Sequence, residues 1–271
     1  MVGFDTHIHS TASDGQCAPG VLVQMAMDRG LLGIAITDHD TVAGIMEAEQ
    51  IAEKLDYPFI PGIELSAQFA EHEVHILGYW PDCHRLAIHP RLIEMRESRL
   101  SRCEEMVRRL NRLGMKLDLA ELTEKAAQDG YSLGRPHLAK AMMEKGYVDT
   151  IREAFAKWLS RGMPGYVPRM KLDPLEAVEI IQSAGGVAAL AHPGVGVPDL
   201  VISRLASAGI GGIEVYHSEH NRAAEHKYLQ LARNFHLAAL GGSDFHAIGT
   251  REMGSRVTTI GQLAILAEHK E

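Results

Sequence analysis

The chain is poor in cysteine and contains no long apolar run. Its three cysteines, Cys17, Cys83 and Cys103, are widely spaced and include no Cys-x-x-Cys pair. This pattern excludes a disulfide framework and a thiolate zinc site, and it is typical of a reducing compartment. No apolar segment approaches the roughly 18 residues that span a bilayer. We therefore expect a cytoplasmic protein with no membrane partner.

Basic residues are also in deficit. The 271 residues include 27 Lys and Arg against 35 Asp and Glu, which gives a formal net charge of −8. An acidic chain is poorly suited to a large nucleic-acid footprint, although a small local basic patch remains open. The first residues, MVGFDTHIHS, contain neither the basic nor the apolar segment of a secretion signal, so we expect none.

Histidine, in contrast, is in excess. There are 15 histidines, as many as the Tyr, Phe and Trp residues together. The hydrophobic share of 46% and the charged share of 23% are ordinary for a globular protein, and the length suits one α/β barrel or up to two smaller domains. The positions of the histidines along the chain are therefore the main clue to function.

Short apolar runs alternate with helical patterns along most of the chain. Seven runs resemble buried strands: Val2–Ile8, Leu32–Thr37, Phe59–Leu65, Val74–Tyr79, Val187–Ala191, Gly212–Tyr216 and Leu237–Leu240. Helical patterns lie between most of them: Val21–Arg29, Ala43–Leu55, Leu175–Ser183 and Ala223–Asn234. This alternation predicts an α/β fold with a parallel sheet covered on both faces, and seven strands favour a closed or nearly closed barrel.

The segment from about His89 to Arg169 interrupts the alternation. It contains consecutive helical patterns, separated by turns with Gly or Pro: Leu92–Leu113, Leu117–Asp129, Pro136–Lys145 and Thr150–Ser160. We therefore predict a helical insertion at 89–169, after the fourth strand, in a barrel domain formed by 1–88 and 170–271. We expect the insertion to contribute to the substrate pocket.

Potential metal ligands gather where the predicted strands end. His7 and His9 are two residues apart in a strand, so they project from the same face and can bind one cation. Similar groups occur at other strand ends: Asp38 to Asp40, Glu64, His192, Glu214 to His217, and Asp244 to His246. His75 is the exception, because it lies early in the fourth strand. The C-terminal strand ends are where barrel enzymes build their active sites.

This set of side chains is too large for one metal ion. Six histidines, together with Asp14, Glu64 and Asp244, predict two or three divalent ions. Imidazole and carboxylate suit Mn²⁺, which we expect, with Fe²⁺, Zn²⁺ and Mg²⁺ as alternatives. A single histidine is usually a surface or packed core residue, but similar groups at six strand ends are not independent accidents.

The ordered motifs HIHS, SDG, TDHD, GIELS, HILGYW, AHPG, IEVYH and GGSDFHA resemble those of the PHP family, named for polymerase and histidinol phosphatase domains. The resemblance covers essentially the whole chain and implies a distorted seven-stranded (β/α) barrel. It implies three metal positions, formed by His7, His9, Glu64 and Asp244, by Glu64, His75 and His192, and by Asp14, His39 and His246. It also implies that Asp14, His39, Glu64 and Asp244 take part in catalysis.

The insertion narrows the resemblance to one branch of the family. Its segments SLGRPHLAKAM and RGMPGYVP resemble the RNase AM/TrpH-like branch. This implies a phosphatase that removes the 3′-phosphate of nucleoside 3′,5′-bisphosphates. The alternative is a 5′-to-3′ exoribonuclease that uses the same metals on short 5′-phosphorylated RNA. Histidinol phosphate fits a two-phosphate site less well, and the intact ligand set speaks against a binding module without turnover. No obligate protein partner is evident.

A substrate with two phosphates needs a second anion site. Arg99 and Arg102 are three residues apart and can share a helix face, although that face can equally be a solvated one. Arg135 and His137 flank Pro136 at a helix start, where N–H groups and a guanidinium can bind phosphate, and the alternative there is a capped turn.

Further candidates lie beside the strand ends. His220 and Asn221 follow the sixth strand and are candidates for contact with the leaving group or nucleoside, whereas His217 can equally pack at the rim. Asp38 and Asp40 are better suited to orienting His39 or capping the next helix than to binding metal.

Overall fold

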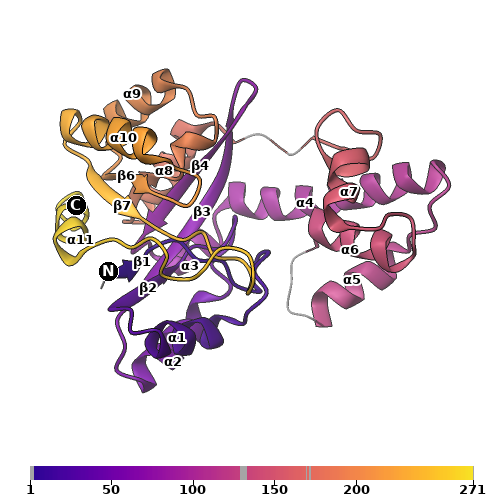
Figure 1. Ribbon diagram of the computed structural model, residues 1–271, viewed down its shortest axis with the longest axis horizontal. Coiled ribbons are helices and arrows are strands. Elements are labelled where there is room, and N and C mark those ends of the chain that lie inside the picture. Colours follow the sequence, from indigo (N-terminus) through magenta and orange to yellow (C-terminus); the bar gives the residue numbers. More distant parts are fainter. Residues whose placement is uncertain (1–2, 129–132, 169, 171, 271) are drawn as a thin grey trace. The chain divides into compact units, whose positions relative to one another are not determined.

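The computed structural model describes residues 3–128, 133–168, 170 and 172–270 (Figure 1). The chain forms two compact units, a barrel unit of Met1–His89 with Lys171–Glu271 and an insertion unit of Pro90–Met170. These borders lie one residue beyond the predicted ones. The predicted boundary residues Val2, Asp129, Gly130 and Arg169, and Ser132 of the SLGRPHLAKAM segment, lie outside the described residues.

The strands of the described chain form one seven-stranded sheet in chain order. They are β1 (Phe4–Asp5), β2 (Gly33–Ile36), β3 (Phe59–Phe69), β4 (His72–Tyr79), β5 (Val187–Leu190), β6 (Gly212–Tyr216) and β7 (Ala238–Gly241). The predicted α/β barrel is confirmed. The prediction of a wholly parallel sheet is wrong at β4, which runs antiparallel to both β3 and β5.

The reversal at β4 arises from a tight hairpin. Both strands extend further than predicted, and only Ala70 and Glu71 separate β3 from β4. Ala70 adopts a positive φ of 49°, which the short turn requires. As a result, the beginning of β4 lies beside the end of β3, with His75 paired to Ser66. An early position in β4 is therefore at the same barrel edge as the late positions of the parallel strands.

Hydrogen bonds between the first and last strand segments bring the sheet close to a closed barrel. His9 N donates to Phe245 O at 2.9 Å, and Asp244 N donates to His7 O at the same distance. Thr258 pairs with Phe4 in an antiparallel bridge, and its hydroxyl accepts from Gly241 N at 2.8 Å. The seam of the barrel, where the first and last strand segments meet, is thus formed by side chains and irregular backbone rather than by a regular ladder of β-sheet hydrogen bonds.

Helices cover the outside of the barrel unit. They are α1 (Pro19–Asp28), α2 (Ile45–Lys54), α3 (Cys83–Ala87), α8 (Pro174–Ser183), α9 (Asp199–Ser207), α10 (Arg222–Asn234) and α11 (Ile260–Ala267), with a 3₁₀ turn at Pro193–Val195. The four predicted helices are present with slightly shifted ends, whereas α3, α9 and α11 were not predicted. Side-chain caps start several of them; Asp173, for example, accepts from Leu175 N at 2.8 Å.

The insertion unit has a hydrophobic core of its own. It contains α4 (Pro90–Arg112), α5 (Leu119–Gln128), α6 (Arg135–Glu144) and α7 (Ile151–Ala154), which continues into a π-helical segment at Phe155–Leu159. Met106, Leu110, Leu138 and Met142 are buried together in this unit. No helix in the described ranges of the chain combines the length and apolar character needed to cross a bilayer.

The barrel seam offers a test of the fold. Thr258→Val keeps the shape of a fully buried side chain but removes the oxygen that accepts from Gly241 N and contacts the Thr6 hydroxyl at 3.0 Å. We expect a loss of about 1–3 kcal/mol in the free energy of unfolding, measured by urea titration. Thr41→Val, which removes an exposed hydroxyl, should cost less than about 0.5 kcal/mol. Equal effects of the two changes would contradict the seam's role.

Candidate metal centre

The paired histidines after β1 converge as their spacing predicts. Ile8 points into the apolar core, so His7 and His9 both point the other way. Their Nε2 atoms are 3.1 Å apart, and both side chains are fully buried. Two ligands of one ion, with bonds of about 2.0–2.2 Å, lie at such a separation.

Glu64 on β3 is the centre of the cluster. Its carboxylate is fully buried and has imidazole nitrogens on all sides. Oε1 lies 2.9 Å from His75 Nδ1, 3.2 Å from His192 Nε2 and 3.4 Å from His7 Nε2, and Oε2 lies 3.0 Å from His39 Nδ1 and 3.1 Å from His9 Nε2. Five histidines from four different strand ends therefore meet at one carboxylate.

Two further carboxylates complete the cluster. Asp244 Oδ1 lies 3.2 Å from His9 Nε2 and 3.5 Å from His246 Nδ1. Asp14 Oδ1 lies 3.4 Å from His246 Nε2, and its Oδ2 lies 3.9 Å from His39 Nε2. The structure thus brings all nine predicted ligands into one continuous group at one end of the barrel.

Ligand atoms of these residues form three overlapping groups. The groups are His7, His9 and Glu64; His39, Glu64 and His75; and His9, Asp14, His39 and His246, and the atoms of each group lie within 4.8 Å of one another. His9 and His39 belong to two groups each, so this division differs from the one that the resemblance implies. Which ion each residue would hold stays a prediction.

Several buried atoms of the cluster lack a partner that a cation would provide. Among the described residues, Nδ1 of His9, Nδ1 of His39, Oε2 of Glu64, Nε2 of His75 and Nε2 of His217 make no hydrogen bond of acceptable geometry. A buried polar atom without a partner costs about 1–3 kcal/mol, and such atoms are rare in native proteins. The donor set of imidazole and carboxylate therefore fits divalent metal ions.

The electrostatics of the cluster also favour a cation. Burial would raise the pKa of Glu64, but the imidazoles of His39, His75 and His7 hold that pKa well below its usual range. Burial would lower the pKa of His9, but the neighbouring carboxylates of Asp244 and Glu64, which can accept from its ring, raise that pKa to about 10. The carboxylates therefore stay ionised, and their charge attracts either protons to the histidines or metal ions to the cluster.

Two of the nine residues have strained backbone. His192 has a φ of 23° and Asp244 a φ of 52°, in the left-handed region that few residues with a side chain adopt. Such strain persists where the surrounding structure imposes it, and it concentrates at functional sites. Both residues lie within three residues of the end of a strand, His192 after β5 and Asp244 after β7.

Asp38 and Asp40 stabilise loops through hydrogen bonds, rather than binding metal or capping a helix. Asp38 accepts from Ser10 N at 2.7 Å and from the hydroxyl of Ser13 at 2.6 Å, so it braces the loop that carries Asp14. Asp40 accepts from Ser66 N at 2.8 Å. The predicted helix cap is wrong, because α2 begins after Gly44 without a side-chain cap.

The side chains of the residues after β6 mostly form hydrogen bonds with nearby backbone. Both ring nitrogens of His220 bind backbone, with Nδ1 at 2.9 Å from Val215 O and Nε2 accepting from Gly194 N at 3.0 Å. Asn221 caps α10 by accepting from Ala224 N. His217 is fully buried, with Nε2 3.6 Å from Asp244 Oδ2, so it lies beside the metal centre rather than at an exposed rim.

The substrate-binding residues predicted in the insertion unit are also engaged locally. Arg102 is buried, donates from Nε to Val167 O at 2.7 Å and lies over the Tyr166 ring, so a solvated face is wrong for it. The Arg135 guanidinium lies over the Phe155 ring. His137 Nδ1 accepts from Gly134 N at 3.0 Å, which forms the cap that was the alternative interpretation. Arg99 is partly exposed on α4.

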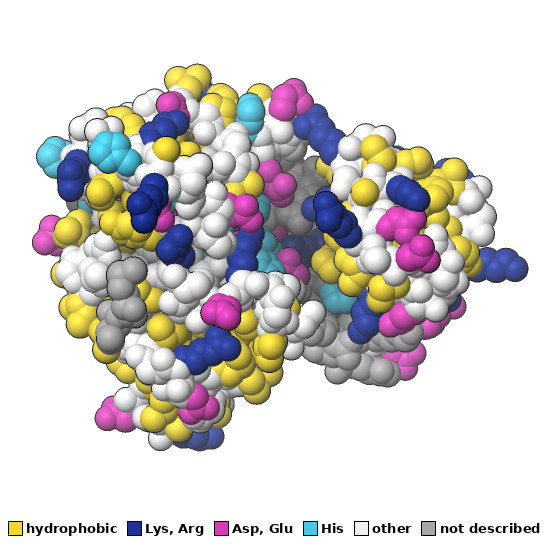
Figure 2. Space-filling view, in the orientation of Figure 1, with side chains coloured by type: hydrophobic (Ala, Val, Ile, Leu, Met, Phe, Trp, Pro, Cys, Tyr) yellow, Lys and Arg dark blue, Asp and Glu magenta, His cyan; other side chains and the backbone are white. Residues whose placement is uncertain are grey.

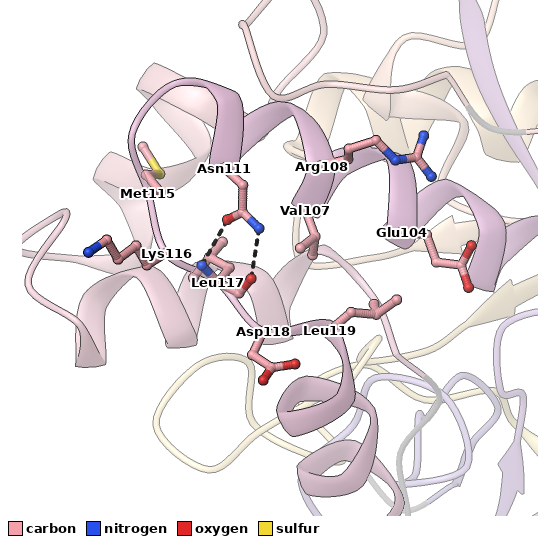
Figure 3. Close-up of a pocket in the computed structure, with 9 residues that line it drawn as sticks. All are labelled: Glu104, Val107, Arg108, Asn111, Met115, Lys116, Leu117, Asp118 and Leu119. Carbon is pink, nitrogen blue, oxygen red and sulfur yellow. Dashed lines mark hydrogen bonds between the residues drawn. The ribbon is translucent and has the colours of Figure 1, made fainter.

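The insertion unit also has an open pocket of about 780 Å³ where α4 ends and α5 begins (Figure 3). Asn111 is one of its lining residues, and its side chain is hydrogen-bonded to both the N–H and the carbonyl of Leu117 at 2.8 Å. The residues that line the pocket include none of the predicted site residues.

Two residues of the metal centre were given no role at the sequence level. Glu214 is fully buried on β6 and contacts both His7 and His192. Arg251 forms ion pairs with Asp244 and with Glu219, whose Oε1 lies 2.7 Å from its Nη2. Glu214 was part of the strand-end group from Glu214 to His217 and of the motif IEVYH, but no role followed from either, whereas nothing in the pattern around Arg251 distinguished it.

Comparison with known proteins is consistent with this geometry. The 3′,5′-nucleoside bisphosphate phosphatase of Chromobacterium violaceum is 35% identical over 254 residues, 92% of this chain and 89% of that protein. The 5′-3′ exoribonuclease Rnm of Escherichia coli is 34% identical over 250 residues, 90% of this chain and 85% of that protein. A crystal structure from Bifidobacterium adolescentis, assigned as a metal-dependent phosphoesterase, superposes with a TM-score of 0.90 at 28% identity, covering 100% of this chain and 97% of that one.

The family assignment follows from these matches and from the site. The PHP domain model matches residues 5–189, which contain six of the nine clustered side chains. The remaining three, His192, Asp244 and His246, follow the matched segment and are brought to the same cluster by the fold. The chain therefore belongs to the PHP domain family and is a phosphoesterase of the metal-dependent type.

Proposed function

We propose that this phosphoesterase hydrolyses the 3′-phosphate of nucleoside 3′,5′-bisphosphates, giving a nucleoside 5′-phosphate and inorganic phosphate. The observation that carries the proposal is the group of nine side chains around Glu64. Six of the nine lie within residues 5–189, and His192, Asp244 and His246 follow that segment. The choice of substrate is supported by the 35% identity to the Chromobacterium violaceum phosphatase.

The nine side chains are the proposed ligands of two or three divalent ions, for which we propose Mn²⁺. When bound, such ions polarise the phosphoryl oxygens, lower the pKa of water and neutralise the charge that develops at phosphorus. Glu64 presents its two oxygens to different imidazoles, so it is suited to bridge two of the ions. Asp14, His39, Glu64 and Asp244 remain the residues that we propose for catalysis.

The exposure of the side chains indicates where substrate enters. His7, His9 and Glu64 are fully buried, whereas the side chains of Asp14 and His246 are 27% and 29% exposed. The Arg251 side chain, 31% exposed, adds a guanidinium next to Asp244. A phosphate that approaches from this side would therefore meet an arginine as well as the proposed ligands, which favours an anionic substrate.

The phosphate that is not cleaved needs a cation of its own. Arg99, Arg102, Arg135 and His137 of the insertion unit stay predictions for this role, as do His220 and Asn221 of the barrel unit for the nucleoside. The local hydrogen bonds of Arg102 and His220 make those two the weaker candidates, because substrate would have to compete with Val167 O and Gly194 N.

The cytoplasm stays our predicted compartment, on the basis of three cysteines that form no disulfide.

A second candidate function is 5′-to-3′ exoribonuclease activity on short 5′-phosphorylated RNA. The observation that favours it is the 34% identity to the Escherichia coli exoribonuclease. The net charge of −8 speaks against tight binding of long RNA. On the face drawn in Figure 2, the described basic and acidic side chains are interspersed rather than gathered in one basic band.

Metal content and ligand variants test the proposed centre. Protein purified without chelator should hold about two or more divalent ions per chain, measured by plasma mass spectrometry. His192→Ala and Asp244→Asn should lower phosphate release about 10³-fold or more, a loss of about 4 kcal/mol in transition-state stabilisation. His226→Ala, a change of the same kind at an exposed position of α10, should leave the rate unchanged. Full activity of a metal-free protein would contradict the centre.

A panel of phosphate esters tests the substrate. With Mn²⁺ present, adenosine 3′,5′-bisphosphate should release phosphate faster than 3′-AMP, and 5′-AMP should be inert, because only the first compound supplies both a scissile 3′-phosphate and a second anion. A short 5′-phosphorylated RNA, followed by gel electrophoresis, distinguishes the exoribonuclease. Preferential shortening of the RNA, with a slow reaction of the bisphosphate, would replace the first proposal by the second.

A further inference from the structure

We propose that Glu214 is a positioning residue that holds two metal ligands at once, by fixing the ring of His7 and the backbone of His192. Glu214 lies on β6 and is fully buried. Its two carboxylate oxygens have different partners, and both partners belong to the proposed ligand set. The inference rests on that ligand set, but it does not depend on which phosphate ester is the substrate.

The first contact sets the orientation of an imidazole. Glu214 Oε1 lies 3.0 Å from Nδ1 of His7. The other ring nitrogen, Nε2, faces the cluster, 3.4 Å from both Glu64 Oε1 and Asp244 Oδ1. When Nδ1–H donates a hydrogen bond to Glu214, the lone pair of Nε2 is left free to bind a cation. The carboxylate also makes the imidazole more basic, and therefore a better metal ligand.

The second contact holds strained backbone. Glu214 Oε2 accepts from the backbone N–H of His192 at 2.7 Å. His192 has φ 23° and ψ 59°, and this conformation turns its ring toward the cluster, with Nε2 3.2 Å from Glu64 Oε1 and 3.3 Å from His75 Nδ1. A strained conformation needs such a restraint, because the free chain does not favour it.

The fold leaves space for this carboxylate. A Cβ atom at Gly242 would lie 2.3 Å from His7 Cβ and 2.8 Å from Glu214 Oε1. Both separations are too short for real atoms, so a side chain at position 242 would displace the pair. The absence of a side chain at this position therefore allows His7 and Glu214 to meet.

A carboxylate can serve both partners, whereas an amide cannot. Glu214→Gln has nearly the same shape but only one acceptor oxygen. If that oxygen accepts from His192 N–H, the amide NH₂ faces His7 Nδ1, which must then be the acceptor and leave the proton on Nε2, where it blocks metal binding. If the oxygen faces His7 instead, two N–H groups meet at His192.

Mn²⁺ binding without substrate tests the inference. The free Mn²⁺ signal in electron paramagnetic resonance gives the number and affinity of sites in the wild type and in Glu214→Gln. We expect the sites of His7 and His192 to weaken about 10–100-fold, as is typical when the partner of a metal ligand is lost. The site of Asp14, His39 and His246 should keep its affinity, because none of these residues contacts Glu214 through a described hydrogen bond.

Two further variants separate positioning from general damage. Glu225→Gln removes the same charge from the partly exposed ion pair with Arg256 and should bind Mn²⁺ as the wild type does. Glu214→Asp retains two acceptor oxygens and should show a smaller loss than Glu214→Gln, which keeps the test decisive if the Gln variant does not fold. Folding is checked by the melting temperature of the metal-free proteins.

Each outcome decides the inference. Selective weakening in Glu214→Gln supports it. Wild-type Mn²⁺ affinity in folded Glu214→Gln overturns it, and so does equal weakening of all sites, which would indicate a general structural role. A wild-type protein that binds no Mn²⁺ overturns the inference together with the proposed ligand set. A negative result in the phosphate-ester panel would overturn only the proposed substrate.

Discussion

The ionised carboxylate of Glu64, buried at the end of the barrel, is the constraint on which the site depends. A buried charge without compensation is very costly, so the residues around it must supply positive charge. Five imidazoles approach this carboxylate, and they come from four strands whose ends meet at one edge of the barrel. A neutral imidazole carries no charge. The histidines therefore compensate the carboxylate only when they bind protons or when they share a metal cation with it. The arrangement of the strand ends, the strained turns and the hydrogen bonds of Glu214 all contribute to keeping these rings in place.

Much of the metal centre could be predicted because its chemistry is local in sequence. The spacing of His7 and His9 fixes a common face, and the strand ends of a barrel meet at one edge. The position of His75 could not be explained, because the run at Val74–Tyr79 gives a strand but not its direction. The hairpin at Ala70 and Glu71 supplies the direction, and with it the reason that an early residue of β4 reaches the site.

Other features depend on contacts between distant residues. Glu214 meets His7 across 207 positions of sequence, and Arg251 approaches Asp244 only because of how the loop after β7 folds. No periodicity signals such pairs. Arg102 shows the converse, because its position on a long helix left a phosphate site and a solvated face equally open, whereas packing in the insertion unit buries it against Tyr166. In that unit, local pattern predicted the helices but not which side chains their packing would enclose.

The order of the ligands along the chain has a consequence for biosynthesis. The nine side chains begin at His7 and end at His246, and backbone hydrogen bonds join the segments that carry these two residues. A nascent chain that has not yet emerged beyond β7 lacks Asp244 and His246, so it presents histidines without the full set of carboxylates. Metal loading would thus follow the completion of nearly the whole barrel, and a bound ion would then hold the earliest and the latest synthesised strands together against unfolding.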